Sequence, residues 1–495
     1  MKEQYGLWLI SRCHCGRDPS SQILRKHSNS LALIGHVMIL SYDPNTTEGR
    51  DSLGNRLFRV TKRRTFLFLQ GPASPFLLEL ARALEARGSA VRKVNFCSGD
   101  VIFWRKSKFD FFRGKDEAWP DYLERLIVGH DVTDLLMLGD GRPKHAAAIE
   151  VCRRIGIKAH IFEHGYLRPD WLTIEPFGMS SQSRFPADPE AIAALADGVT
   201  LPPLRPPYPS SFLTYALYDL LYHVPNVALG WLLHPHYRTH GPVHPVQEYS
   251  GWIRKGLTAR RRKEQANRIA QRYLSPVRTF DFFLFPLQLP GDYQIRRHAP
   301  MGDLFRILQA VIGSFSRHAP AGSRLLFKTH PIDNGLHDWV TQIAGMAARC
   351  GVADRIDVID GGDLATLIKA CRGLVTVNST VGLTALQLQS PVIALAPAIY
   401  DVPGLSHQAS LASFWQEPEA PDTALLDRLI RAMTATIQIP GGFIGKQAIV
   451  EGAAAMAEKL LENNKALSAE PVSQRGWFRY GEELANAENS LTSEC

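Results

Sequence analysis

Three ionisable side chains stand just after apolar, strand-like runs and could do acid–base or nucleophilic chemistry. His330 follows residues 325–328, and Pro331 ends that strand because proline cannot donate to a sheet ladder. Asp292 and Glu163 also follow apolar runs. Open α/β sheets bind ligands at the carboxyl ends of their strands. A histidine there can hold an anion, whereas a carboxylate can act as a nucleophile or a base. The alternative for the histidine is that it only caps its own loop.

A second polar group is the triplet Asn378, Ser379 and Thr380, which stands between an apolar run and a helical pattern. Asn, Ser and Thr are strong helix N-caps, and the free N–H groups of a helix start bind anions. Lys328, two residues before His330, adds a cation. These residues together predict a phosphate-binding edge in the second half of the chain.

The rest of the sequence supplies the elements that would hold these groups. Apolar runs of strand length alternate with helical patterns, which is typical of parallel α/β domains. The expected strands are residues 65–70, 91–96, 134–138 and 158–162, and then 281–288, 325–328, 356–359, 373–377 and 391–395. We therefore expect two Rossmann-like, doubly wound domains, at residues 63–184 and 276–420.

Three other segments do not follow this alternation. Residues 1–62 carry polar clusters with little periodicity, so we expect a poorly ordered N-terminal appendage. Residues 185–275 are predicted to be a helical, basic insertion and linker, with a helical pattern at 212–233 interrupted by Pro225. Its aromatic and basic residues could lie on an anionic membrane surface, or could simply form a solvated face. Residues 421–495 are expected to form C-terminal helices and a polar tail.

Composition narrows the class of protein. The 495 residues include 56 Lys and Arg against 48 Asp and Glu, and this charge of +8 favours anionic partners. The seven cysteines show no pair of zinc-ligand spacings, so no metal site is expected, and their scatter suits a reducing cytoplasm. No apolar run reaches about 18 residues, which predicts no transmembrane helix. No nucleic-acid-binding motif is present, so no nucleic-acid partner is expected.

Seven short stretches between Phe66 and about Trp415 carry a resemblance to a known family. They are residues 68–72 (FLQGP), 95–104, 163–171 (EHGYLRPDW), 286–296, 328–333 (KTHPID), 378–382 (NSTVG) and 398–401 (AIYD). In this order the chain resembles bacterial capsular polysaccharide synthesis proteins of the KpsS/LipB type. The first 60 residues lie outside the resemblance.

The resemblance implies a GT-B-like glycosyltransferase with two Rossmann-like domains facing a cleft. Such proteins are β-Kdo transferases that start the capsule linker. They use CMP-Kdo as donor, without a separate cofactor, and a (lyso)phosphatidylglycerol acceptor. The implied place is the cytoplasmic surface of the inner membrane, with other capsule synthesis and export proteins as partners. A transferase using another nucleotide sugar, such as CMP-sialic acid, and a non-catalytic capsule-export scaffold remain the alternatives.

The resemblance also implies roles for single residues. Asp292 would be the nucleophile of a retaining reaction, Glu163 the general base for the acceptor, and His330 the partner of the departing phosphate. His164 stands where a more distant relative carries an acid. The residues expected to bind substrate are Gln70, Gly71, Arg168, Gln288, Gln294, Lys328, Asp333, Asn378, Ser379 and Thr380.

Overall fold

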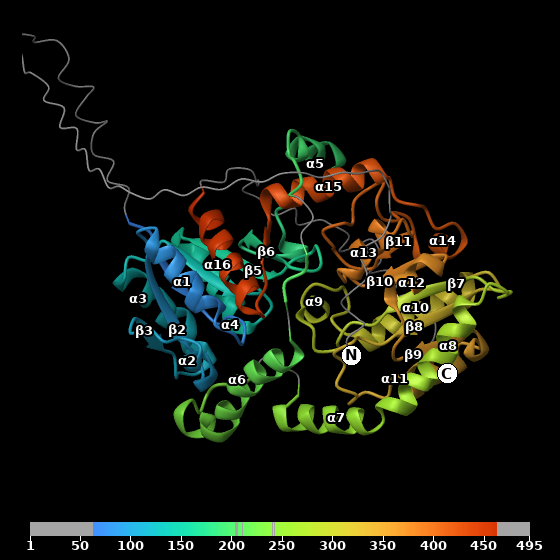
Figure 1. Cartoon of the computed structure of the whole chain (residues 1–495), viewed down its shortest axis with the longest axis horizontal. Helices are drawn as coiled ribbons and strands as arrows, with labels where there is room; N and C mark the ends of the chain where they lie inside the picture. Colours follow the sequence, from blue (N-terminus) through green and yellow to red (C-terminus); the bar gives the residue numbers. More distant parts are fainter. Residues whose placement is uncertain (1–62, 203–205, 210, 240, 242, 463–495) are drawn as a thin grey trace, which may run out of the picture. The chain divides into compact units, whose positions relative to one another are not determined.

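Two α/β sheets organise the chain in the computed structural model, which describes residues 63–462 except 203–205, 210, 240 and 242 (Figure 1). The predicted appendage at residues 1–62 and the polar tail beyond residue 462 lie outside the described residues. Each sheet is built mostly from parallel strands, and helices cover both of its faces.

The first sheet has seven strands. Its order is β12 (Gln438–Pro440), β6 (Trp171–Pro176), β5 (Lys158–His164), β4 (Asp134–Leu138), β1 (Thr65–Phe68), β2 (Ala90–Asn95) and β3 (Phe109–Phe111). The strands from β3 to β5 are parallel, and β6 pairs antiparallel with both β5 and β12. Continuous apolar runs form β1 and β4 because both faces of a parallel sheet are buried.

Helices of distant sequence cover the first sheet. On one face α1 (Phe76–Ala86) packs beside α16 (Lys446–Leu461), and Phe76 and Met456 belong to the same buried cluster (Figure 1). On the other face α3 (Trp119–Gly129) and α4 (Pro143–Ile155) pack through Trp119 and Ile149. The C-terminal segment therefore returns to complete the N-terminal domain with β12 and α16.

The second sheet is parallel throughout. Its order is β11 (Val392–Ala394), β10 (Gly373–Thr376), β7 (Phe282–Pro286), β8 (Arg324–Lys328) and β9 (Ile356–Ile359). One face carries α10 (Leu304–His318), α11 (Trp339–Arg349) and α14 (Leu411–Gln416). The other carries α8 (Ala259–Leu274), α12 (Leu364–Ala370), α13 (Val381–Gln387), α15 (Thr423–Thr436) and α5 (Pro189–Ala196).

Both sheets have the same connectivity in their parallel parts. The chain starts at a central strand, adds two strands on one side, and then crosses to add two on the other. Such a reversal creates a switch point between the first and fourth strands, where ligands bind in doubly wound folds. Two Rossmann-like sheets with a helical insertion confirm the predicted α/β, GT-B-like fold.

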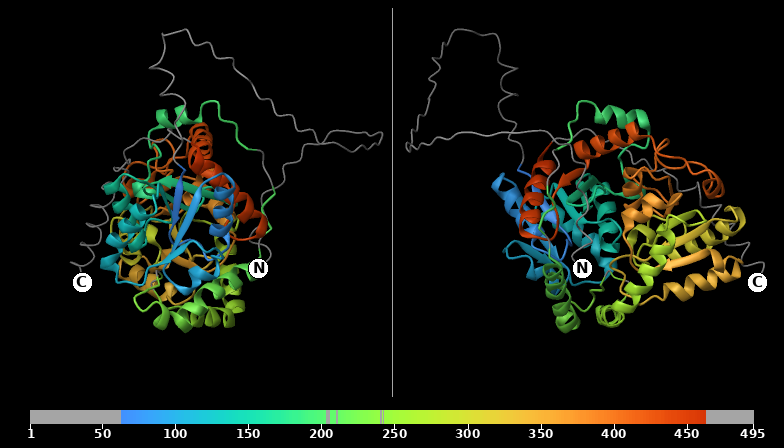
Figure 2. Two further views of the ribbon diagram at one scale, coloured as in Figure 1. Left: turned by 90° about the vertical axis from the view of Figure 1, so that its left-hand side faces the viewer. Right: turned by 45° about the vertical axis from the view of Figure 1, so that its right-hand side comes forward.

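Among the described residues, the insertion between the sheets contains three helices before α8. They are α5, already described, then α6 (Phe212–Leu233), which packs on the short α2 (Ser98–Ile102), and α7 (Pro245–Leu257) (Figure 2). The predicted interruption of the first helix is wrong, because α6 runs through Pro225. Tertiary packing outweighs the local penalty of a helical proline here.

Candidate functional site

Asp292 begins the short helix α9 (Tyr293–Arg296) at the exit of β7, beside the switch point of the second sheet. Its Oδ1 accepts a hydrogen bond from the Gln294 N–H at 2.9 Å. Burial raises the pKa of the Asp292 carboxyl, although the Gln294 N–H, His298 and the Gln288 amide oppose that rise. One carboxylate oxygen thus caps α9, and the group is poorly solvated.

Two predicted substrate-binding residues hold the turn that carries Asp292. Gln288 donates from Nε2 to Asn378 Oδ1 at 3.0 Å and accepts from the Asn378 N–H at 3.3 Å. Asn378 in turn donates from Nδ2 to the Gln294 carbonyl at 3.0 Å. The exits of β7 and β10, the strands on either side of the switch point, are therefore bonded to each other around Asp292.

Glu163 lies inside β5, where it pairs with Thr173 of β6. The expectation that it is the first residue after the strand is wrong, because β5 continues to His164 and turns back as an antiparallel hairpin. Gly139 leaves room for its carboxylate, since a Cβ on that glycine would lie 2.9 Å from Glu163 Oε2.

The electrostatics of Glu163 suit a proton acceptor near neutral pH. Burial raises the pKa of its carboxyl to about 7, and the charge of Asp292 adds to the rise, while Arg142 and Arg168 oppose it. Glu163 and Asp292 come from different sheets, and Glu163 lies within reach of the charge of Asp292. The structure therefore brings together the two carboxylates that the sequence singled out.

His330 follows β8, separated from it by Thr329, and is half-buried. Its Nδ1 accepts from the Ile332 N–H at 3.3 Å, so the neutral ring carries its proton on Nε2. Burial lowers the pKa of His330, and Lys328, Lys255 and Arg168 lower it further against the opposing effect of Asp333. His330 is therefore a neutral donor at pH 7, beside residues that supply the positive charge.

Lys328 ends β8 and is 6% exposed. Its ammonium has no hydrogen-bond or ion-pair partner within the part of the chain that the structure describes, and burial lowers its pKa while Asp360 and Asp363 oppose that shift. The ammonium nitrogen itself remains open to solvent, so a positive charge on an otherwise buried side chain is available to bind an anion. Lys328 is thus the strongest sign of an anion-binding position in this region.

The other cations near His330 come from different parts of the chain. Arg168 is exposed, and its charge acts on both Glu163 of the first sheet and His330 of the second. Lys255 of α7 donates to the Asp333 carbonyl at 2.7 Å. Asp333 itself has a structural role in its loop, since its carboxylate accepts from the Gly335 N–H at 2.8 Å and from Trp339 Nε1 at 3.0 Å.

Ser379 and Thr380 precede α13 as predicted. The Ser379 Oγ accepts from the Val381 N–H at 3.2 Å, and the Ser379 carbonyl accepts from the Tyr400 hydroxyl at 2.6 Å. Thr380 is the N-cap residue, but its side chain makes no capping bond. The hydroxyl of Thr380 is thus available for a ligand at the exit of β10.

Gln70 and Gly71, at the exit of β1, are engaged within the protein. Gln70 Nε2 donates to the hydroxyls of Tyr222 at 2.6 Å and Tyr237 at 3.1 Å, and its Oε1 accepts from Arg142 at 3.0 Å. A Cβ on Gly71 would lie 2.4 Å from Leu77 Cδ1, so the glycine lets α1 pack closely. These two residues hold the insertion and α1 in place.

Several residues that join the two sheets carry no signal in the sequence. The buried His298 lies between Asp140 Oδ1, at 3.1 Å from Nε2, and Ser181 Oγ, at 2.7 Å from Nδ1. Ser180 donates to Gln294 Oε1 at 2.5 Å. Burial raises the pKa of Asp140, but the bond and charge of His298 outweigh it, and the pKa is lowered. The segment from Asp292 to His298 is thereby bonded to the exit of β4.

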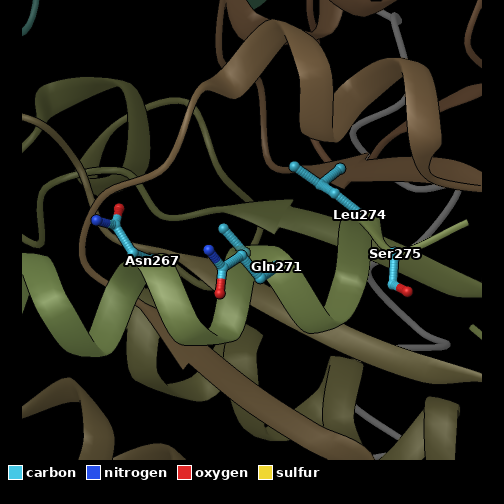
Figure 3. Close-up of a pocket in the computed structure, with 5 residues that line it drawn as sticks. Asn267, Gln271, Leu274 and Ser275 are labelled. Atoms are coloured by element: carbon cyan, nitrogen blue, oxygen red, sulfur yellow. The ribbon is translucent and has the colours of Figure 1, made fainter.

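A separate surface pocket of about 380 Å³ lies along α8 and is lined by Asn267, Ala270, Gln271, Leu274 and Ser275 (Figure 3). None of its lining residues belongs to the predicted site. Within residues 63–462 and the gaps already given, no group of three or more His, Cys, Asp or Glu residues is arranged to hold a metal. Among the same residues, no helix is both long and apolar enough to span a membrane.

Fold and site together define a two-sheet, GT-B-like α/β protein with carboxylates and cations gathered at strand exits. The chain belongs to the capsule polysaccharide biosynthesis protein family, whose model matches residues 133–444. It is 32% identical over 384 residues to the capsule polysaccharide export protein KpsS of Escherichia coli, which covers 76% of this chain and 95% of that protein. This confirms the resemblance stated from the sequence.

A second curated relative agrees with this membership. The capsule polysaccharide modification protein LipB of Neisseria meningitidis serogroup A is 30% identical over 385 residues, covering 76% of this chain and 91% of LipB. Among solved structures, KpsC of Thermosulfurimonas dismutans, a beta Kdo 2,7 transferase, aligns with 14% identity and a TM-score of 0.38. That alignment covers 80% of this chain and 99% of the KpsC chain.

Proposed function

We propose that this protein is a retaining β-Kdo transferase of capsule biosynthesis. It moves Kdo from CMP-Kdo to a phosphatidylglycerol-type lipid acceptor at the cytoplasmic surface of the inner membrane. The observation that carries the proposal is that the charge of Asp292, after β7 of the second sheet, acts on Glu163 of the first sheet, while Lys328 and His330 stand at the end of the neighbouring strand β8. Membership of the capsule family supports the biological setting.

In the first step the Asp292 carboxylate attacks the anomeric carbon of Kdo. The bond from that carbon to the phosphate oxygen breaks, and the electron pair leaves with CMP. The oxygen of Asp292 that does not cap α9 is the attacking atom. His330 donates from Nε2 to the departing phosphate, while Lys328 balances its charge and Thr380 adds a hydroxyl.

In the second step Glu163 removes the proton from the acceptor hydroxyl. That oxygen attacks the anomeric carbon and breaks its bond to Asp292, which returns as a carboxylate. Two inversions give net retention. A carboxyl with its pKa raised to about 7 suits this task, because it is basic enough to take the proton and a large fraction of it is still ionised near neutral pH.

The decisive experiment measures transfer from CMP-Kdo to a fluorescent phosphatidylglycerol acceptor and reads the product by mass. Asp292→Asn should lose at least about a thousandfold in rate, as expected for removal of a nucleophile. The matched control is Asp303→Asn, because Asp303 caps α10 in the same way and accepts from the Phe305 N–H at 2.8 Å.

If Asp292 only caps its helix, both asparagine variants will keep most of their activity, since asparagine is a good N-cap. Such a result would exclude the covalent mechanism. Parallel reactions with CMP-sialic acid and a UDP-sugar test the donor. Transfer from one of those and none from CMP-Kdo would contradict the proposed donor, and no transfer from any donor would favour a non-catalytic scaffold.

A further inference from the structure

Helix α6 presents an apolar surface that no described residue covers. Of the twenty large apolar side chains that are exposed in the described residues, twelve lie on α6, including Leu213 at 78% and Trp231 at 74% exposed. Leu257 of the neighbouring α7 is 83% exposed. Apolar side chains gathered in this way on one element mark a surface that binds a partner or a membrane.

The opposite face of α6 is fixed to the first domain. Tyr222 is buried and packs so closely on α2 that a Cβ at Gly99 would lie 2.6 Å from the Tyr222 carbonyl oxygen. Asn226 accepts a hydrogen bond from the Gly99 N–H at 2.9 Å, and Tyr218 packs edge-on against Phe103 at 5.6 Å. These contacts span two turns, so α6 is held along its side and cannot project end-on.

The segment after α6 has a large net positive charge compared with that of the whole chain. Residues 245–274 contain eight Lys and Arg and two Glu, an excess of six within a total of +8. Arg261, Lys263 and Arg268 are exposed and have no hydrogen-bond or ion-pair partner in the described part of the chain. Their charge is therefore available to an anionic surface.

The apolar and the cationic elements are neighbours. Tyr249 of α7 donates to Asp219 of α6 at 2.9 Å, and both figures of the whole chain draw the two helices next to each other (Figures 1 and 2). Helix α8 follows α7 directly at Thr258. Helix α7 thus links the apolar α6 to the exposed cations of α8, and we call these three helices the α6–α8 surface.

We propose that the α6–α8 surface binds an anionic lipid bilayer, with α6 lying in the plane of the headgroups. Apolar side chains enter the interface while neighbouring cations meet the lipid charge. A second copy of the chain is a poorer occupant, because its own cation-rich helices would be brought against this positive charge.

The role of this surface rests on the proposed function. A bilayer bound there would bring the acceptor lipid close to the sheet that carries Glu163. Tyr222 on the inner face of α6 bonds Gln70, Gln70 bonds Arg142, and Arg142 acts on the carboxyl of Glu163. A short chain of contacts therefore joins the lipid-facing helix to the proposed base.

Flotation of the full chain with vesicles, in the absence of any nucleotide sugar, tests the surface. Binding should be clear with vesicles of phosphatidylglycerol and phosphatidylcholine, weak with phosphatidylcholine alone, and reduced by salt. The pair Leu213→Glu and Trp231→Glu should weaken binding about tenfold or more. Arg261→Glu with Lys263→Glu should weaken it on the order of tenfold at low salt. Val128→Glu is the matched control, because Val128 is 71% exposed on α3.

Absence of binding to the anionic vesicles, or equal binding by all variants, would overturn the proposal. If the α6 pair instead turns an oligomer into a monomer and leaves vesicle binding unchanged, a second copy is the occupant. Transfer to a short-chain, water-soluble phosphatidylglycerol separates the two proposals. Variants that no longer bind vesicles should still transfer Kdo to this soluble acceptor. If the proposed function is wrong, there will be no transfer to any acceptor.

Discussion

The two sheets share one strand order, but the polar side chains at their strand ends are used in opposite ways. At the first strand of the first sheet, Gln70 is saturated by bonds to Tyr222, Tyr237 and Arg142. At the second strand of the second sheet, Lys328 is equally buried yet has no bonded partner among the described residues. The exit of β1 in the first sheet therefore holds the protein together, whereas the exit of β8 in the second sheet is arranged to hold an anion.

Glu163 is the exception on the first sheet. It lies on β5, and the charges of Arg142, which belongs to the saturated network, and of Asp292 both act on its carboxyl. The proposed reaction requires a donor site, which the second sheet would provide, and a proton acceptor, which the first sheet would provide. The following four predictions test this division of roles, beginning with the largest expected effect.

Removal of the anion-binding groups should damage catalysis most. His330→Ala and Lys328→Met should each lower the rate of transfer by about 10²- to 10³-fold, because the departing phosphate loses a donor or a positive charge. Steady-state kinetics with CMP-Kdo as the varied substrate measures the effect. Lys369→Met, which removes an exposed lysine of α12, is the control and should be neutral. Full activity of both site variants would mean that the second sheet does not bind the donor phosphate.

Removal of the histidine between the sheets should mainly affect stability. His298→Ala leaves the buried carboxylate of Asp140 without its Nε2 partner, so we expect a loss of about 3 kcal/mol in the free energy of unfolding. Urea unfolding gives the value, with His318→Ala at the exposed end of α10 as control. A change of less than about 0.5 kcal/mol would show that this bond does not join the sheets.

The nine expected strands agree with nine strands of the two sheets, but β3, β6 and β12 and several site contacts were not expected. Buried parallel strands are continuous apolar runs, so the predicted strands 281–288 and 325–328 correspond to β7 and β8. Glu163 was misplaced because β5 pairs with an antiparallel neighbour, and polar residues there are part of a hairpin. His298, Arg142 and the bonds of Gln70 depend on which distant segments meet, and a single sequence carries no sign of that.

Breaking the saturated network should destabilise the first domain without changing donor binding. Gln70→Ala removes the partner of two buried tyrosine hydroxyls and of Arg142, which should cost about 2 kcal/mol in unfolding free energy. The Michaelis constant for CMP-Kdo should stay within about twofold of the wild-type value. A large rise in that constant with unchanged stability would instead give Gln70 the substrate-binding role that the resemblance implied.

The smallest effect is a shift in pH dependence that reports on the pair Arg142 and Glu163. The Glu163 pKa is about 7 against an ordinary 4.5, so the folded protein holds this proton more tightly than the unfolded chain. Ionisation of Glu163 therefore opposes folding increasingly as pH rises from about 4.5 to about 7. The proposed base works only when it is ionised. The value of kcat/KM should therefore rise with pH, with the midpoint of the rise near the Glu163 pKa of about 7.

Arg142 lowers the pKa of Glu163. Removal of its charge must therefore move the rising limb of the kcat/KM profile to higher pH. We expect Arg142→Met to shift the rising limb of kcat/KM by up to about one pH unit, and Arg142→Lys to shift it much less because the charge is kept. The limb belongs to the coupled pair of Glu163 and Asp292, so the direction of its shift is the informative quantity. A downward shift, or an equal shift in both variants, would remove Glu163 from the role of base. The first sheet would then contribute only structure, and the second sheet would have to supply the proton acceptor as well.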